Sequence, residues 1–332
     1  MQRKNVLGRA ETSQIYMLQW SMSASIHASR NTIERFKRVQ TLLEQLNPEA
    51  PPQALLVPGS PMPRGNTIVF PGSFNPPTNA HLALLKQARD FARQPSRRGL
   101  SEAKRSAFQS VAPTADLSAR APAPVHLYAA ISKHTIDKET VERPLLLDRV
   151  MLLDTVLHHH LRHTGILLFN RGLYVEEAEA VKSSFPEVTR LFFLIGFDKI
   201  VQILDPRYYK DRDTALRELF ALAELLVAPR GNAGVDELHS LLNQPANQPF
   251  ADHIHILPFS PAYRTISSTS IRQYPHAHLN DIPPEVQRFI LETHAYESPQ
   301  HLPDGTQIDY YGQRIKALEK LLGPNREGLG DM

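Results

Sequence analysis

A glycine, hydroxyl side chains and a histidine are crowded into one short stretch of the chain. The stretch reads FPGSFNPPTNAH and runs from Phe70 to His81. Gly72 permits close approach of the backbone to a ligand. Thr78 or Asn79 can cap a following helix, whose N-terminus attracts anions. His81 would lie in the first helical turn, where its imidazole can donate a hydrogen bond to charge that develops during phosphoryl or nucleotidyl transfer.

A second stretch with similar chemistry lies almost two hundred residues later. It reads TISSTSIRQYP, from Thr265 to Pro275. Ser267, Ser268 and Thr269 offer hydroxyls and backbone donors at a predicted helix start, and Arg272 follows one turn later. Hydroxyls, amides and a guanidinium together suit a polyphosphate. The second stretch alone would be typical of an N-cap with a surface arginine. The first stretch as a whole already favours a phosphate-binding site, and the second strengthens that interpretation.

The elements around these stretches alternate between strands and helices. Apolar runs predict strands, and amphipathic patterns predict helices between them. The predicted strands are 67–70, 125–131, 165–169, 190–195, 224–228 and 253–257, and the predicted helices are 31–46, 79–92, 143–160, 176–184, 214–221 and 235–242. This order predicts an α/β fold with a mostly parallel sheet flanked by helices. Both polar stretches follow strands, so they should meet at the edge where such sheets bind ligands.

The composition excludes several classes of protein and site. The 332 residues are 42% hydrophobic, carry a formal net charge of +3 and include no cysteine. Disulfides, thiolate catalysis and cysteine-based zinc sites are therefore excluded. The mild charge gives no argument for a nucleic-acid partner, and no apolar run is long enough to predict a membrane span. The sequence also lacks a Walker A loop and a G-x-G-x-x-G string.

Composition also suggests how the chain is organised. We expect an N-terminal helical extension with a proline-rich linker (1–65), a catalytic domain (66–275) with a basic insertion at about 93–124, and a C-terminal helical region (276–332). The first thirty residues are rich in Arg and Ser and contain one acid, Glu11. A mitochondrial presequence is one interpretation of them. We favour a plain extension and a cytoplasmic or nuclear location.

The two polar stretches resemble the paired signatures of the T/HxGH nucleotidyltransferase superfamily. GSFNPPTNAH is similar to GxFxPxTxxH, and ISSTSIR is similar to ISSTxIR. The segments LIGFDKIVQI (194–203) and LLVAPRGNAG (225–234) resemble two further strand ends of this family. The pattern is most similar to the eukaryotic nicotinamide and nicotinate mononucleotide adenylyltransferases. The resemblance implies a Rossmann-like nucleotidyltransferase fold.

The resemblance also implies a set of site residues and a reaction. The implied residues are Gly72, Ser73 and Phe74 near the phosphates or the mononucleotide, Thr78 and His81 facing the ATP phosphates, Gly196 and Asp198 at the ribose, Arg230 near the phosphates or adenine, and Ser268, Thr269 and Arg272 at the β- and γ-phosphates. His81 and Arg272 would be catalytic. The 5′-phosphate of nicotinamide mononucleotide would attack the α-phosphorus of ATP and release pyrophosphate. Mg²⁺ would be held mainly by substrate and water. No nucleic-acid or membrane partner is implied, and homo-oligomerisation stays open.

The sequence departs from this family at the acceptor side. The family often has a tryptophan after the GxD helix, where this chain offers Tyr208 or Tyr209. The family's lysine after the second strand could correspond to Lys133 or Lys138, followed by Arg149 and Met151 with altered spacing. Two alternatives therefore remain: a transferase of the same superfamily with another phosphorylated acceptor, and a nucleotide-binding regulatory protein with weak ATPase activity.

The run LHHHLRH, residues 157–163, raises the question of a metal site. It ends a predicted helix, where histidine suits the local dipole. Asp154 is the only carboxylate within about a turn of it. We therefore favour a solvated helix end over a zinc site.

Overall fold

The computed structural model describes residues 26–93, 125–133, 143–231 and 234–323, with side chains described from residue 31 to residue 91 in the first range. The extension before residue 26, nearly all of the basic insertion, and Lys138 lie outside the described residues.

Strands and helices alternate through the catalytic part of the chain, as the sequence predicts. The elements up to the middle of the chain are α2 (Ile26–Gln45), β1 (Ala54–Leu56), β2 (Gly65–Pro71), α3 (Asn79–Arg93), β3 (Val125–Ser132), α5 (Leu146–His160), β4 (Thr164–Phe169) and α6 (Tyr174–Ser184). The next are β5 (Val188–Gly196), α7 (Phe197–Leu204), α8 (Arg212–Leu222), β6 (Glu224–Ala228), α9 (Val235–Leu242), β7 (Ile254–Ile256) and α10 (Ser268–Gln273). The C-terminal region adds α11 (Pro284–Thr293), the short strands β8 (Gln300–His301) and β9 (Gln307–Ile308), and α12 (Tyr310–Leu322).

The strands form one seven-stranded sheet in the order β1-β4-β3-β2-β5-β6-β7. Strand β1 is antiparallel to β4, and the other neighbours are parallel. Successive parallel strands are added outward from β2 to β4 on one side of the sheet and from β5 to β7 on the other. This is the Rossmann strand order, and its switch point lies between β2 and β5. Ligands of such sheets bind beyond the carboxyl ends of the strands at this switch point. The predicted fold class is confirmed.

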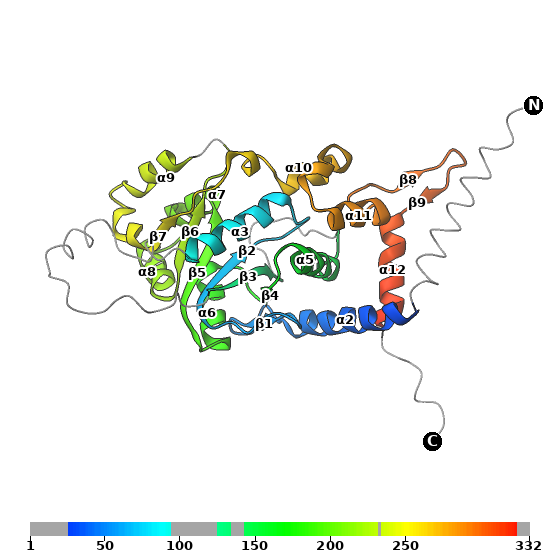
Figure 1. Ribbon diagram of the computed structural model, residues 1–332, viewed down its shortest axis with the longest axis horizontal. Coiled ribbons are helices and arrows are strands. Elements are labelled where there is room, and N and C mark those ends of the chain that lie inside the picture. The colour runs from blue at the N-terminus through cyan, green and yellow to red at the C-terminus, as the bar shows by residue number, and fades with distance from the viewer. Residues whose placement is uncertain (1–25, 94–124, 134–142, 232–233, 324–332) are drawn as a thin grey trace, which may run out of the picture.

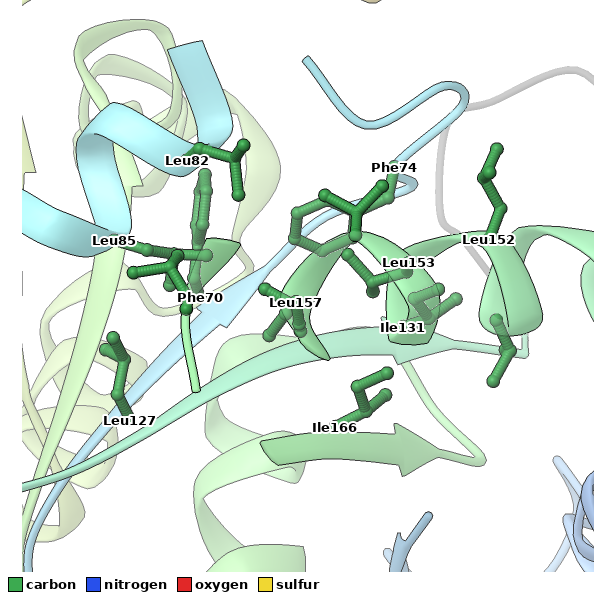
Figure 2. Packing of buried hydrophobic residues seen from close by; sticks show 14 of the residues in the cluster. Phe70, Phe74, Leu82, Leu85, Leu127, Ile131, Leu152, Leu153, Leu157 and Ile166 are labelled. Atoms are coloured by element: carbon green, nitrogen blue, oxygen red, sulfur yellow. The ribbon is translucent and has the colours of Figure 1, made fainter. Parts of the chain in front are cut away.

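The sheet is buried on both faces, which explains why its strands are almost continuously apolar. Along β3, Leu127, Ala129 and Ile131 join the core on one face, while Tyr128 and Ala130 join the core on the other. Figure 2 shows the first of these cores from close by, where side chains of α3 and α5 gather around the strands.

The helices divide between the two faces. Helices α2, α3, α5 and α11 contribute to the first core, and α6, α7, α8 and α9 contribute to the second. In Figure 1, α2, α5, α11 and α12 lie together toward the right of the sheet, and α8 and α9 lie toward the left. Helix α11 packs on α5, and α12 packs on both α11 and α2. No helix in the described ranges is both long and apolar enough to cross a bilayer.

Strand β1 is the main difference from the predicted organisation. Its segment lies in the proline-rich stretch that predicts only an extended linker, yet Leu55 pairs with Leu168 and places β1 at the edge of the sheet. The sheet thus begins before residue 66, the predicted start of the domain. A three-residue strand between prolines has too little alternation to be recognised in the sequence. Helix α5 also begins at Leu146, three residues later than predicted, after Pro144.

Candidate active site

A cleft of about 700 Å³ opens beyond the carboxyl ends of β2, β5 and β6. The predicted site residues that line it are Gly72, Ser73, Thr78, His81, Gly196, Asp198, Arg230, Ser268, Thr269 and Arg272. These residues come from four separate segments of the chain, each following a strand or beginning a helix. The fold therefore brings ten of the eleven predicted site residues to one place.

Phe74 is the exception. Its side chain is only 1% exposed, lies in the core below the cleft and contacts the ring of Phe70 edge-on. The Phe74 backbone adopts a left-handed conformation with φ of 42°. A Cβ at position 72 would lie 3.2 Å from the Phe74 ring. Glycine at this position therefore leaves room for the ring to pack beneath the turn. Phe74 thus shapes the turn instead of lining the cleft.

The imidazole of His81 is oriented by the helix that carries it. The Oγ1 of Thr78 accepts a hydrogen bond from the backbone N–H of His81 at 3.3 Å, and His81 Nδ1 accepts one from the backbone N–H of Thr78 at 3.0 Å. The two residues form a reciprocal cap at the start of α3, in which histidine takes the place usual for Glu or Gln. Because Nδ1 accepts, the ring proton is assigned to Nε2. Nε2 is thereby a hydrogen-bond donor on a cleft-lining side chain.

Two hydrogen bonds join the distant signature stretches directly. Ser268 Oγ donates to the carbonyl oxygen of Pro76 at 2.9 Å, across 192 residues of sequence. Arg272 Nη1 donates to the carbonyl oxygen of Asn75 at 2.7 Å, across 197 residues. The same guanidinium reaches Thr269 Oγ1 through Nη2 at 3.3 Å. The predicted meeting of the two stretches at one sheet edge is therefore observed.

A second arginine lies beneath the signature turn. Arg149, on α5, donates through Nη1 to the carbonyl oxygen of Ser73 at 3.4 Å. Its Nε is buried and has no hydrogen-bond partner among the described residues. Burial lowers the pKa of Arg149, and the nearby charge of Arg272 adds to this effect. Two guanidinium groups, those of Arg149 and Arg272, thus donate to main-chain carbonyls of the signature turn.

The opposite wall of the cleft comes from the ends of β5 and β6. Asp198, in the first turn of α7, forms an ion pair with Arg230 at 3.1 Å. Both side chains are largely exposed, so this pair is screened and can open at little cost. Gly196 ends β5 beside the Arg230 side chain. A ligand on this wall would meet a carboxylate and a guanidinium side by side.

Three of the residues suggested for the acceptor side, Tyr208, Tyr209 and Lys133, do not line the cleft. Tyr208 is 55% exposed, and the hydroxyl of Tyr209 donates to the carbonyl oxygen of Ile203. Lys133 Nζ donates to the carbonyl oxygens of Leu43 and Leu46 at 2.7 and 2.6 Å, so it caps the end of α2. None of these three side chains is among the lining residues of the cleft.

Three aromatic residues that the sequence analysis did not single out do line the cleft: Tyr174, Phe259 and Tyr263. Tyr174 begins α6, and its ring packs edge-on against Phe193. Phe259 and Tyr263 lie between β7 and α10 with ring centroids 6.1 Å apart. Tyr263 is partly exposed and belongs to no periodic pattern, which explains why the sequence gives no signal for it.

A buried acid lies close to this end of the sheet. Glu177, one turn after Tyr174 on α6, is 2% exposed and accepts a hydrogen bond from Ser132 Oγ at 2.7 Å. Its Oε2 has no hydrogen-bond partner among the described residues. Burial raises the pKa of Glu177 to about 8, so the carboxyl is largely protonated at neutral pH.

The histidine run does not form a metal site. His159 Nδ1 and His160 Nε2 both contact Glu285 of α11, at 2.7 and 3.1 Å. Across the described ranges, no group of three or more His, Asp or Glu side chains is arranged to hold a metal ion. The run instead connects α5 to α11.

Comparison with known proteins assigns the family. No curated protein matches the chain significantly. Among solved structures, Plasmodium falciparum nicotinic acid mononucleotide adenylyltransferase complexed with APC aligns with 15% sequence identity and a TM-score of 0.43, over 70% of this chain and 96% of that chain. The cytidylyltransferase-like family model matches residues 69–274, which includes both signature stretches. Since this match spans more than half of the chain and every strand from β3 to β7, the protein belongs to the cytidylyltransferase-like family and is a nucleotidyltransferase.

Proposed function

We propose that the protein is an adenylyltransferase that joins ATP and nicotinamide mononucleotide to give NAD and pyrophosphate. The observation that carries this proposal is the pair of hydrogen bonds from Ser268 and Arg272 to the turn that precedes His81. They bring the hydroxyls and guanidinium of one signature beside the imidazole of the other. This combination of donors suits a triphosphate.

The chain's own groups would act by positioning and by stabilising charge. His81 would donate from Nε2 to a non-bridging oxygen of the α-phosphate as the mononucleotide phosphate attacks. Arg272, Ser268 and Thr269 would hold the β- and γ-phosphates, which leave as pyrophosphate. The phosphate of the mononucleotide is itself the nucleophile, so the protein need only align it and exclude competing water.

Magnesium would enter as part of the nucleotide substrate. Among the described residues that line the cleft, Asp198 is the one carboxylate, and it pairs with Arg230. Phosphate and water oxygens would therefore supply most of the Mg²⁺ ligands, as is usual for this cation. Bound Mg²⁺ would supply positive charge that neutralises the phosphates.

A second candidate function is nucleotide binding with weak ATP hydrolysis and a regulatory role. It is favoured by the acceptor side, where Tyr208, Tyr209 and Lys133 all lie away from the cleft. The cleft would then offer fewer side chains to bind an acceptor than to bind ATP. Tyr263 and Phe259 offer aromatic surfaces in the cleft for a pyridine ring, which keeps the transferase proposal in first place.

The deciding experiment identifies the products made by the purified full-length chain. ATP with Mg²⁺ would be incubated separately with nicotinamide mononucleotide, with nicotinate mononucleotide and without an acceptor, and the products separated by chromatography. CTP would replace ATP in a parallel set. A dinucleotide and pyrophosphate in equal amounts are expected with ATP and nicotinamide mononucleotide. ADP and phosphate without dinucleotide would support the regulatory candidate, and a product only with CTP would show that CTP, not ATP, is the nucleotide substrate.

A further inference from the structure

The C-terminal region contacts the signature turn through one tyrosine. Tyr296 follows α11, beyond the end of the family match at residue 274. Its hydroxyl donates to the side-chain Oδ1 of Asn75 at 2.7 Å, across 221 residues of sequence. The region contacts this part of the chain a second time, where Asn79 Nδ2 donates to the carbonyl oxygen of Asn280 at 3.0 Å.

Asn75 connects the C-terminal region to the cleft. It is 1% exposed and lies in the first signature between Gly72 and His81. Its side-chain oxygen accepts from Tyr296, and its main-chain oxygen accepts from Arg272 Nη1 at 2.7 Å. The Asn75 carbonyl is therefore one of two acceptors, with Thr269 Oγ1, that hold the guanidinium at the cleft.

We propose that Tyr296 is a positioning residue for nucleotidyl transfer: its hydroxyl fixes Asn75, and the Asn75 carbonyl in turn holds Arg272 at the cleft. This inference rests on the proposed function and assigns a role in the site to a part of the chain outside the matched family domain. Tyr296 itself does not line the cleft, and Asn75 is the residue that accepts hydrogen bonds from both Tyr296 and Arg272.

The surroundings of Tyr296 suit a permanent donor. Burial raises the pKa of its hydroxyl well above the ordinary value, although the charges of Arg272 and Arg149 act in the other direction. The hydroxyl therefore keeps its proton at neutral pH. Asn75 depends on it, because Asn75 Nδ2 is buried and has no partner among the described residues. Without the hydroxyl, both polar ends of the buried carboxamide would lack a hydrogen bond, which favours a shift of the turn.

The test compares Tyr296→Phe with Tyr128→Phe. Tyr128 is also buried, and its hydroxyl donates to the carbonyl oxygen of Pro61 at 2.8 Å, away from the cleft. Both variants lose one buried hydroxyl. Their thermal unfolding midpoints are compared, so that a difference in activity is not caused by a difference in stability. We expect Tyr296→Phe to lower kcat about tenfold. The dissociation constant for pyrophosphate, measured by calorimetry, should rise about tenfold. KM for nicotinamide mononucleotide should stay the same. Tyr128→Phe should change none of these values.

A double-mutant cycle with Asn75→Ala separates positioning from a general loss of structure. If Tyr296 acts through Asn75, adding Tyr296→Phe to Asn75→Ala should lower kcat and pyrophosphate affinity no further. Additive losses, or a Tyr296→Phe variant that behaves like Tyr128→Phe, would overturn the inference.

The pyrophosphate titration keeps this test independent of the proposed reaction. If the wild-type chain forms no dinucleotide, the proposed function fails, and the titration alone decides the role of Tyr296. Weaker binding by Tyr296→Phe alone would support that role, and equal binding would contradict it. A wild-type chain that binds no pyrophosphate would overturn both proposals.

Discussion

At the scale of single residues, the site depends on side chains that are held before any ligand arrives. His81 accepts from the Thr78 backbone through Nδ1 and forms tilted ring contacts with Phe70 and Phe74. The helix cap and the core together fix the ring and its tautomer. Such preorganisation lowers the cost of stabilising charge in a transition state.

His81→Ala should therefore reduce catalysis far more than stability. We expect kcat for dinucleotide formation to fall about 100- to 1,000-fold, because a donor to the reacting phosphate is lost. The loss of the cap should cost only about 1 kcal/mol in the free energy of unfolding. Initial rates and urea denaturation would measure the two effects.

Two further variants sharpen this prediction. His81→Gln keeps an N–H donor and should recover part of the rate. His239→Ala removes an exposed histidine from α9 and should leave the rate unchanged. An undiminished rate in His81→Ala would remove this imidazole from the mechanism.

Glu177 gives a prediction about pH. Burial raises its pKa from 4.5 to about 8, so the folded state holds a proton that the unfolded chain releases. The free energy of unfolding should then fall as the pH rises from about 4.5 to about 8. Glu177→Gln stays neutral throughout and should be more stable than wild type at pH 8, by on the order of 2–4 kcal/mol.

Urea midpoints of wild type and Glu177→Gln between pH 4 and pH 9 would test this prediction. The two curves should coincide near pH 4 and separate as the pH rises. Glu177→Asp is a useful control, since it keeps the ionisable group on a shorter side chain. Parallel curves for wild type and Glu177→Gln would show that the buried carboxyl is not protonated in the folded state.

At the scale of elements, helix α2 is fixed to the carboxyl ends of β3 and β4. Lys133 Nζ holds its last turn through the carbonyl oxygens of Leu43 and Leu46. Asn170, which is fully buried, donates to the carbonyl oxygens of Asn47, Ala50 and Pro51. The N-terminal helix is thus part of the catalytic fold.

Lys133→Met distinguishes this capping role from a role in acceptor binding. We expect the free energy of unfolding to fall by about 1–2 kcal/mol, because two carbonyl groups lose a charged donor. KM for nicotinamide mononucleotide should not change. Lys320→Met, on the exposed side of α12, controls for the loss of one positive charge. A KM that rises tenfold or more only in Lys133→Met would place the Lys133 ammonium at the acceptor.

Strands and helices whose apolar residues recur at regular spacing could be predicted from the sequence. Single contacts between residues far apart in the chain could not. The apolar strands between residues 67 and 257 were predicted within a few residues of their positions, and so were the helices in this range except α7 (Phe197–Leu204), which was not predicted. The cleft followed from two signatures placed after strands. By contrast, β1 is too short to show a pattern, and Tyr296 finds Asn75 across 221 residues through a single hydroxyl. Lys133 was suggested as an acceptor-binding residue because it follows a strand. A lysine at that position can equally cap a helix, and the sequence does not distinguish the two roles.

At the scale of the whole molecule, the C-terminal region and the catalytic part share one buried polar junction. Asp148, at the start of α5, is 2% exposed. Its carboxylate accepts from Arg314 at 2.7 and 3.0 Å and from the Tyr311 hydroxyl at 2.7 Å, both on α12. The neighbouring residue, Arg149, contacts the signature turn. A substitution at the junction should therefore affect the packing of the C-terminal helices and also the structure of the cleft.

Arg314→Ala tests whether the two parts unfold together. Removing the guanidinium leaves the buried Asp148 carboxylate without its charged partner, which should cost about 3 kcal/mol in the free energy of unfolding. Arg207→Ala is the matched control, because Arg207 is 84% exposed and pairs with Asp205 at the surface, where solvent screens the pair and it contributes little to stability. Urea titrations of Arg314→Ala that follow helical circular dichroism and catalytic activity should give a single shared midpoint. If the helical signal fell in an early step while activity persisted, α11 and α12 would be a separate unit that merely rests on the catalytic domain.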